Sequence, residues 1–218
     1  VTVIGEAMLE LSRGTGDGWT LGYGGDVINT AIHLARSGDR VRLASAMGTD
    51  PMSAELCAAW EAEGVDTALV LRAADRLPGL YAIETDASGE RSFHYWRGEA
   101  AARRMFDLPG SAEMVAQAAQ SDLLYFSLIT LAILPDEGRE ALLDLCARVR
   151  AGGGKVAFDG NYRAGCGAMP QPPATGAIGR LRSATWGCRR WRTRWRWAQP
   201  TTRRTPPPAG ARGRGVRW

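Results

Sequence analysis

The chain has 218 residues, which is enough for one domain, or two small ones, with a real hydrophobic core. Its formal net charge of +4 hides two parts of opposite sign: residues 164–218 hold twelve arginines and no acidic residue, which leaves 15 basic against 23 acidic residues before position 164. The sequence shows neither a basic leader before an apolar run nor a stretch of about 18 apolar residues, so it predicts no signal peptide and no membrane span.

Four widely spaced cysteines form no C-x-x-C pair, and the chain has only two histidines. This pattern argues against a structural zinc site. It fits a reducing compartment, where a buried free cysteine behaves as a small apolar residue. We therefore expect no metal site and a cytoplasmic location.

Strands and helices alternate along residues 1–163, because short apolar runs predict strands and amphipathic stretches predict helices. In chain order we expect a strand at 1–9, a helix at 27–38, a strand at 39–48, a helix at 50–64, a strand at 65–72, a hairpin at 77–97, a helix at 111–120, a strand and then a loop at 122–134, a helix at 136–153 and a strand at 154–163. The alternation predicts an α/β fold with a mostly parallel central sheet flanked by helices. The hairpin interrupts it and is expected to project as a lid.

In open α/β sheets, ligands bind beyond the carboxyl ends of the strands. Three segments with polar ends, "GGD", "YFSLIT" and "FDGNYR", are therefore expected to converge on one crevice.

The first segment, "GYGGDVIN", combines two glycines with a helix start. Gly24 and Gly25 would let the backbone approach a ligand closely, and the helix N-terminus offers free N–H groups. Asp26 and Asn29 lie one turn apart and could bind hydroxyl groups. The alternative is a tight turn in which Asp26 only caps the helix.

A separate candidate, "RSFHYWR" in the expected hairpin, places Tyr95 and Arg97 on one face of a strand. An arginine can hold a carboxylate through two parallel hydrogen bonds, and a tyrosine can pack on a sugar ring. His94 points to the opposite face and is expected to be structural. The alternative is a cross-strand aromatic residue beside a solvated arginine.

In the third segment, "FDGNYR", Asp159, Asn161 and Arg163 alternate at the end of a buried strand. Arg163 could bind a carboxylate or a phosphate. The alternative is loop capping by the aspartate and the asparagine.

Taken together, these segments resemble the PfkB (ribokinase-like) carbohydrate kinases, in which an N-terminal strand with Gly-Glu, a Gly-Gly-Asp helix start, a β-lid and an Asp-x-Asn-x-Arg strand end occur in this order. The stretches "GYGGDVINTAIHLARSG", "RLPGLYAIETDASGERSFHYWRGEAAAR" and "GGGKVAFDGNYR" resemble the branch that phosphorylates 2-keto-3-deoxygluconate. The resemblance covers residues 1–163. It departs at Leu128, where the family usually has glycine.

The resemblance implies a ribokinase-like fold and transfer of the γ-phosphoryl group of ATP, with Mg²⁺, to a sugar acid. The lid elements would lie near 12–24 and 78–98, and lids of this family often pair into homodimers. The implied substrate-binding residues are Gly24, Gly25, Asp26, Asn29, Tyr81, Tyr95, Arg97 and Arg163, and the implied nucleotide-binding residues are Asn161 and Arg163.

Residues 164–218 differ in composition from the rest of the chain, with seven prolines, five tryptophans and no acidic residue. We expect this tail to be disordered, and the mixture of Arg, Pro, Ala, Gly, Trp and Cys suggests a frameshift product. The G-A-G-D segment that carries the family's catalytic aspartate is absent, so we expect the C-terminal half of the fold to be missing and the chain to be inactive. The alternatives are a sugar-acid-binding remnant, or nucleic-acid binding through "RRWRTRWRW", which is the weaker interpretation.

Overall fold

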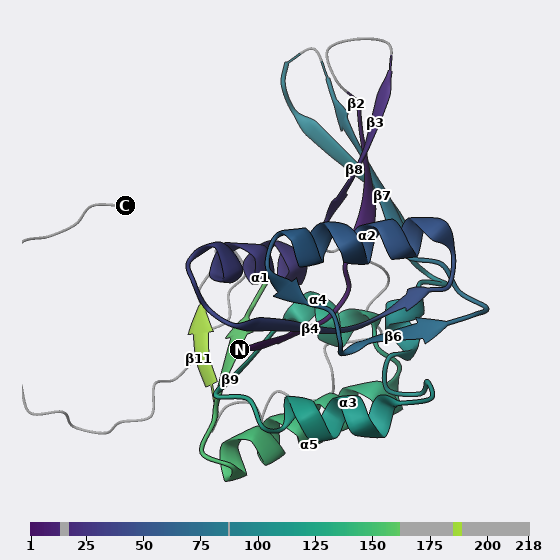
Figure 1. Ribbon diagram of the computed structural model, residues 1–218. Coiled ribbons are helices and arrows are strands. Elements are labelled where there is room, and N and C mark those ends of the chain that lie inside the picture. The colour runs from purple at the N-terminus through teal and green to yellow at the C-terminus, as the bar shows by residue number, and fades with distance from the viewer. Residues whose placement is uncertain (14–17, 87, 162–184, 189–218) are drawn as a thin grey trace, which may run out of the picture.

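The computed structural model describes residues 1–13, 18–86, 88–161 and 185–188. Its core is a parallel β-sheet between two layers of helices, and a second, smaller sheet projects from one side (Figure 1). The expected α/β class, with a mostly parallel central sheet and helices on its faces, is confirmed.

The central sheet runs in the order β11-β10-β9-β1-β4-β5, with β6 also paired to β4. Every pairing between its described strands is parallel. Its strands are β1 (Thr2–Ile4), β4 (Val41–Gly48), β5 (Val65–Asp66), β6 (Val70–Ala73), β9 (Leu123–Ser127), β10 (Lys155–Asp159) and β11 (Thr185–Cys188). Because all strands point the same way, their carboxyl ends share one edge of the sheet.

Helices α1 (Asp26–Arg36) and α2 (Pro51–Ala62) cover one face of this sheet, and α3 (Ser111–Ala118) and α5 (Asp136–Ala151) cover the other (Figure 1). Each interface buries an apolar cluster. Trp60 is fully buried in the cluster under α1 and α2, and Phe126 is fully buried in the cluster against α5. These clusters hold the layers together, because burial of a large side chain stabilises a fold by about 1.5–3 kcal/mol.

The second sheet, which we call the lid sheet, consists of β2 (Met8–Arg13), β3 (Trp19–Gly24), β7 (Gly79–Thr85) and β8 (Arg91–Trp96) in the order β3-β2-β7-β8. It rises above α2 (Figure 1). The predicted hairpin is confirmed as the antiparallel pair β7 and β8, and the Gly89 amide donates to the Asp86 carbonyl in its turn at 3.0 Å.

Three predicted elements differ from the structure. The strand expected at 1–9 is split into β1 and β2, because the chain leaves the central sheet after Ile4 and enters the lid sheet at Met8. The strand expected at 65–72 is interrupted by a turn, in which the Val70 amide donates to the Thr67 carbonyl at 2.9 Å. The loop expected after β9 is the short helix α4 (Leu128–Ile133), which the Ser127 side chain caps by accepting from the Thr130 amide at 3.4 Å.

The segment 164–218 showed no strand periodicity in the sequence, yet the structure describes four of its residues as strand β11. This strand pairs in parallel with β10, from Thr185 opposite Val156 to Cys188 opposite Asp159. Main-chain pairing along an open sheet edge needs no apolar alternation, which explains why the sequence gives no sign of it. The remaining residues of the segment lie outside the described part of the chain.

Candidate functional site

The functional site was expected at the carboxyl edge of the central sheet, and the structure brings several polar residues to that edge. Glu6 follows β1, Ser127 ends β9 and Asp159 ends β10, and these three strands are neighbours in the parallel sheet. The segment "GGD" differs, because it follows β3 of the lid sheet and leads into α1. The site therefore lies where the lid sheet joins the core.

The two glycines allow close packing at this junction. Gly25 is the N-cap of α1 with φ 136°, a backbone conformation that favours glycine. A side chain at Gly24 would collide with the Tyr81 hydroxyl and lie 3.0 Å from Glu10 Oε2. The alternative interpretation of Asp26 as the helix cap is wrong, since Gly25 holds that position without a side-chain hydrogen bond.

Asp26 is the first residue of α1, and its Oδ1 accepts from the Val27 amide at 2.9 Å. Its Oδ2 is buried and has no hydrogen-bond partner among the described residues, so a donor that reached this oxygen would satisfy it. Asn29 lies one turn further along α1 and its side chain is exposed. The structure thus places Asp26 at the junction and Asn29 on the accessible surface of the same helix.

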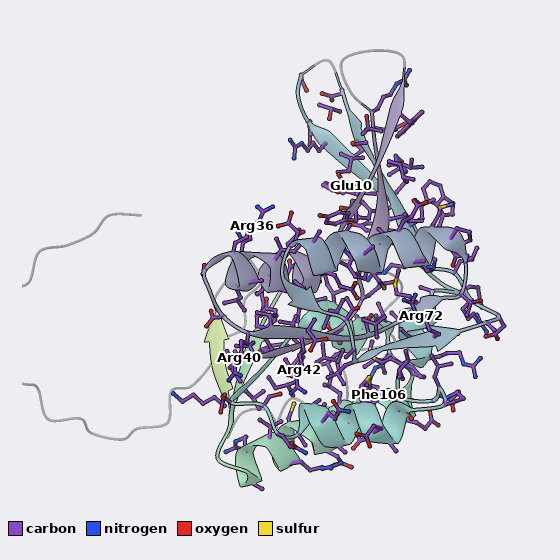
Figure 2. All side chains as sticks on the ribbon, in the orientation of Figure 1. Glu10, Arg36, Arg40, Arg42, Arg72 and Phe106 are labelled. Atoms are coloured by element: carbon purple, nitrogen blue, oxygen red, sulfur yellow. The ribbon has the colours of Figure 1, made fainter. Side chains whose placement is uncertain are left out.

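The lid sheet carries a row of polar and aromatic side chains on one face. Strand register places Glu10 opposite Tyr81 and Tyr81 opposite Tyr95. The Tyr81 hydroxyl donates to the Glu10 carboxylate, and the Tyr81 and Tyr95 rings lie 5.9 Å apart; Figure 2 shows Glu10 within the lid sheet. Burial, and then the hydrogen bond to Glu10, raise the pKa of Tyr81, so its hydroxyl stays protonated and donates to Glu10.

Arg97 follows β8, and its guanidinium donates to the Glu6 carboxylate. The side chains are 6% and 1% exposed, so the ion pair is buried. Arg97 also lies over the Tyr95 ring, with its central carbon 5.7 Å from the ring centre. Burial raises the pKa of Glu6 above its ordinary value, although the charge of Arg97 acts in the opposite direction. The alternative of a solvated Arg97 is therefore wrong.

His94 was expected to be structural on the opposite face of β8. Its side chain is half exposed, and Nε2 lies 3.2 Å from Glu84 Oε2 on the neighbouring strand. This contact links the two strands of the hairpin and places His94 away from Tyr81 and Tyr95.

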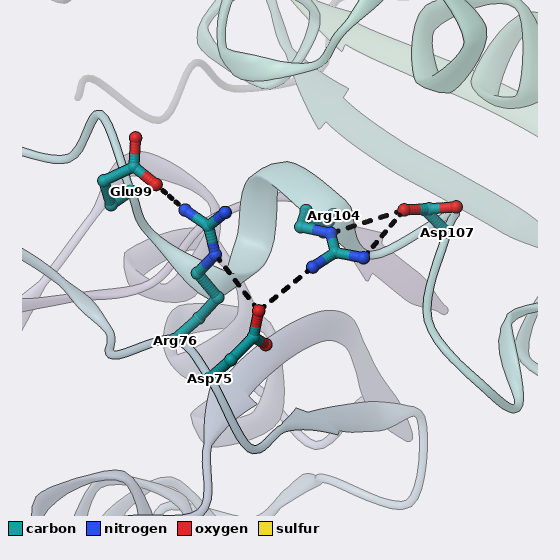
Figure 3. A network of polar contacts seen from close by, with 5 residues as sticks. All are labelled: Asp75, Arg76, Glu99, Arg104 and Asp107. Atoms are coloured by element: carbon teal, nitrogen blue, oxygen red, sulfur yellow. Dashed lines mark hydrogen bonds and ion pairs between the residues drawn. The ribbon is translucent and has the colours of Figure 1, made fainter.

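A pocket of about 260 Å³ lies beside the lid junction. It is lined by Arg76, Gly98, Glu99, Ala100, Arg103, Arg104 and Pro135. Two of its arginines are paired: Arg76 contacts Glu99 and Asp75, and Arg104 contacts Asp75 at 3.2 Å and Asp107 at 3.0 Å (Figure 3). Within the described part of the chain Arg103 has no such partner, and its charge acts on Glu6. Arg103 is therefore an available cation at the edge of the site.

The segment after β10 is described only in part. The Asp159 carboxylate accepts from the Asn161 amide at 3.1 Å, which is the local capping expected of these residue types. Arg163, predicted to bind the acid or the phosphate, lies outside the described residues, and so does the basic run at 189–197. The nucleotide-binding role of Asn161 stays a prediction.

Among the residues that the structure describes, no three His, Cys, Asp or Glu side chains gather closely enough to hold a metal ion. Likewise, no helix in the described ranges is both long and apolar enough to cross a membrane.

Sequence reasoning missed three side chains of this site: Glu6, Glu10 and Arg103. The Gly-Glu pair at the end of the first strand was noticed only as a family feature, and nothing in the linear sequence pairs Glu6 with Arg97, 91 positions away. For Glu10, the signal was available as a charged residue between Leu9 and Leu11 in β2.

The chain is similar in sequence to known proteins. Residues 1–176 match the pfkB family of carbohydrate kinases. Over 167 residues the chain is 48% identical to a 2-dehydro-3-deoxygluconokinase of Escherichia coli (strain K12) and 47% identical to one of Dickeya dadantii (strain 3937). Each match covers 75% of this chain and 54% of the relative, so the chain spans about half the length of the curated relatives it matches.

Solved structures show the same fold. A PfkB protein from Polaromonas sp. JS666 has a TM-score of 0.71 and 28% identity, covering 85% of this chain and 64% of that one. The 2-dehydro-3-deoxygluconokinase of Thermotoga maritima has a TM-score of 0.71 at 22% identity, covering 84% of this chain and 57% of that one. The expected ribokinase-like fold is confirmed over this part. The chain belongs to the pfkB family of carbohydrate kinases.

Proposed function

We propose that the protein is a sugar-acid kinase whose substrate is 2-keto-3-deoxygluconate. The observation that carries this proposal is the arrangement at the lid junction. The buried cation Arg97 lies over the Tyr95 ring, Tyr81 lies next to Tyr95, and the charge of Asp26 acts on Glu6, the partner of Arg97. A sugar acid needs one fixed positive group for its carboxylate and several partners for its hydroxyls. The identity of 48% to a named 2-dehydro-3-deoxygluconokinase supports the same assignment.

In this proposal Gly24 and Gly25 let the substrate approach the backbone, and Asp26 and Asn29 bind its hydroxyls. Tyr81 and Tyr95 bind it from the lid sheet. Arg97 and Arg163 bind its acid group. These roles match what each group can do: Asp26 has an acceptor oxygen that no described residue uses, and the Tyr81 oxygen can accept a hydrogen bond while its proton is donated to Glu10.

ATP would supply the phosphoryl group, and Mg²⁺ would offset the charge that develops on it. We propose that Asn161 and Arg163 face the nucleotide. The printed sequence contains no G-A-G-D segment, and on that ground we propose that the 218-residue chain by itself binds the sugar acid without phosphorylating it. The cytoplasmic location stays a prediction.

The test is calorimetry and a coupled ADP assay on the same protein, with 2-keto-3-deoxygluconate, its galactonate epimer and fructose as ligands. Binding of the keto-deoxy acid without ADP release is the expected result. ADP release would show that the chain is a complete catalyst, whereas preference for fructose would refute the assignment to sugar acids.

We also propose that the reading frame changes after Arg163, since acidic residues disappear there while arginine, proline and tryptophan accumulate. The DNA across codons 155–175 should be sequenced from an independent template, and the other two frames translated. An alternative frame that encodes a G-A-G-D segment would support a shift. If neither frame encodes one, the proposal is wrong.

Finally, we propose that the lid sheet forms a homodimer. Strand register places Trp19, Leu21 and Trp96 on the face opposite Tyr81, and these three side chains are 46%, 54% and 60% exposed. Exposed apolar side chains grouped on one face are typical of a surface that pairs with another protein. A second copy would bury this face and leave the tyrosine face directed to the substrate.

A further inference from the structure

We propose that Glu6 is a positioning residue for Arg97, holding the guanidinium of Arg97 in the orientation that receives the substrate's acid group. The identity of the ligand rests on the proposed function. The dependence of Arg97 on Glu6 does not rest on it, because that dependence can be measured in the protein without a ligand.

The pair connects two points where the chain passes between the central sheet and the lid sheet. Glu6 lies in the three-residue connection between β1 and β2, and Arg97 directly follows β8. The guanidinium donates to Glu6 Oε2, and both side chains are almost completely buried. Glu6 therefore contacts Arg97 at the point where the chain leaves β8, and it does so from the connection that follows the central strand β1.

Glu6 is itself fixed by its surroundings. A side chain at Gly79 would collide with Glu6 Oε1, and one at Gly25 would lie 3.0 Å from the Glu6 carbonyl oxygen. Glu6 is thus packed between two backbone segments, one from the lid sheet and one at the start of α1. Because the Glu6 carboxylate is confined in this way, it fixes the direction in which the Arg97 guanidinium points. The Tyr95 ring, which the guanidinium covers, restricts its movement on another side.

The pair is not hydrogen-bonded as fully as a purely structural ion pair would be. Within the described ranges, Glu6 Oε1 and Arg97 Nε are both buried and have no hydrogen-bond partner, and Asp26 Oδ2 is in the same state nearby. An unsatisfied buried polar group costs about 1–3 kcal/mol, and buried ion pairs contribute little net stability even when satisfied. The Glu6–Arg97 pair is therefore expected to add little to the free energy of unfolding, so fold stability does not explain why the two residues are paired. A guanidinium held in one orientation, with its Nε–H not used by any described residue, is suited to binding a carboxylate.

Two substitutions of Glu6 separate positioning from charge. Glu6→Gln keeps an oxygen that accepts from Arg97 and removes the negative charge. Glu6→Ala removes both. If Glu6 merely neutralises Arg97, both variants should bind an anionic ligand more tightly, whereas positioning predicts that Gln preserves binding and Ala weakens it.

Gly79→Ala gives a third variant that keeps both charges. Its methyl group would displace the Glu6 carboxylate, so positioning predicts the same loss as in Glu6→Ala. This variant keeps the test decisive if Glu6→Ala does not fold.

The experiment records the Nε–H signals of ¹⁵N-arginine-labelled full chain by NMR, with the Arg97 signal identified by its loss in Arg97→Lys. We expect a slowly exchanging Arg97 signal in the wild type and in Glu6→Gln, and its loss in Glu6→Ala and Gly79→Ala. An unchanged Arg97 signal in Glu6→Ala or Gly79→Ala would overturn the proposal.

Calorimetry with 2-keto-3-deoxygluconate completes the test. We expect Glu6→Gln to bind within about threefold of the wild type and the two displacing variants to bind about tenfold or more weakly, as loss of one charged hydrogen bond implies. Equal affinity in all variants would also overturn the proposal. A wild type that shows the expected Arg97 signals but binds no sugar acid would refute the proposed function and leave the positioning of Arg97 by Glu6 supported.

Discussion

Tyr81 and Glu10 face each other across neighbouring strands of the lid sheet, and the Tyr81 hydroxyl donates to the Glu10 carboxylate. Gly24 leaves the space that this pair occupies, because a side chain there would collide with the tyrosine hydroxyl. The glycine is therefore required by the lid and not only by the approach of a ligand. This relationship connects the segment "GGD" to the lid face that is proposed to bind the sugar acid.

We predict that Gly24→Ala weakens binding of 2-keto-3-deoxygluconate by about tenfold, because the added methyl group displaces the Tyr81 hydroxyl from the position in which Glu10 holds it. Gly22→Ala is the matched control, since it lies on the same strand and a side chain there meets no atom within 4 Å. Calorimetry on both variants is the measurement. Equal affinity of the two variants would contradict the role given to Gly24.

Asp50 caps α2, where its carboxylate accepts from the Ser53 amide at 3.0 Å and from the Ser53 hydroxyl at 2.6 Å. We predict that Asp50→Ala lowers the free energy of unfolding by about 1 kcal/mol at neutral pH. Asp39→Ala, at an exposed aspartate outside the helices, serves as the control and should change it little. Urea unfolding followed by circular dichroism measures both.

The contribution of Asp50 should also depend on pH. Partial burial acts to raise the pKa of Asp50, but the hydrogen bonds from Ser53 outweigh it and hold the pKa below its ordinary value. A carboxyl whose pKa is lower in the folded state stabilises the fold above its unfolded pKa of about 4, and this is lost as the pH falls through the folded pKa. The difference between wild type and Asp50→Ala should therefore shrink in acid, and a constant difference would contradict this.

The sequence predicted most of this fold because its elements are set by local patterns. Asp50-Pro51 gave the start of α2, and the turn at 86–89 gave the hairpin. The loop expected after β9 was wrong because α4 depends on a cap between Ser127 and Thr130, and Thr130 also donates to the Ile4 carbonyl, which is distant in the sequence.

Those parts of the candidate site that depend on local sequence patterns could also be predicted. The glycines and the lid tyrosines form motifs that can be read from consecutive residues. The partners of Arg97 and Tyr81 could not be predicted, because Glu6 and Glu10 reach them only through strand register and through the passage of the chain between two sheets. Register is fixed by the folded sheet, so the polar pairs at its base follow from the fold.

Cys146 gives a test of the core that needs no ligand. It is buried in the cluster against α5, and burial raises the pKa of its thiol to about 12. At pH 8 roughly one such thiol in ten thousand is ionised, and the thiolate is the reactive form. We predict that Cys146 resists alkylation in the native protein and reacts after unfolding in urea. Peptide mass mapping separates it from the other three cysteines, and rapid native labelling of Cys146 would show that the core around α5 is not formed.

The exposed apolar face of the lid sheet leads to a prediction on assembly. If two copies pair through it, Leu21→Glu should shift the protein from dimer to monomer, because a charge would be buried against an apolar partner surface. Thr20→Glu is the matched control, since Thr20 is the exposed neighbour of Leu21 and strand alternation directs it to the opposite face. Sedimentation velocity at several concentrations distinguishes the outcomes. A wild type that stays monomeric, or a control that dissociates as readily as Leu21→Glu, would refute pairing through this face, because the proposed dimer buries the face that carries Trp19, Leu21 and Trp96 and leaves Thr20 outside it.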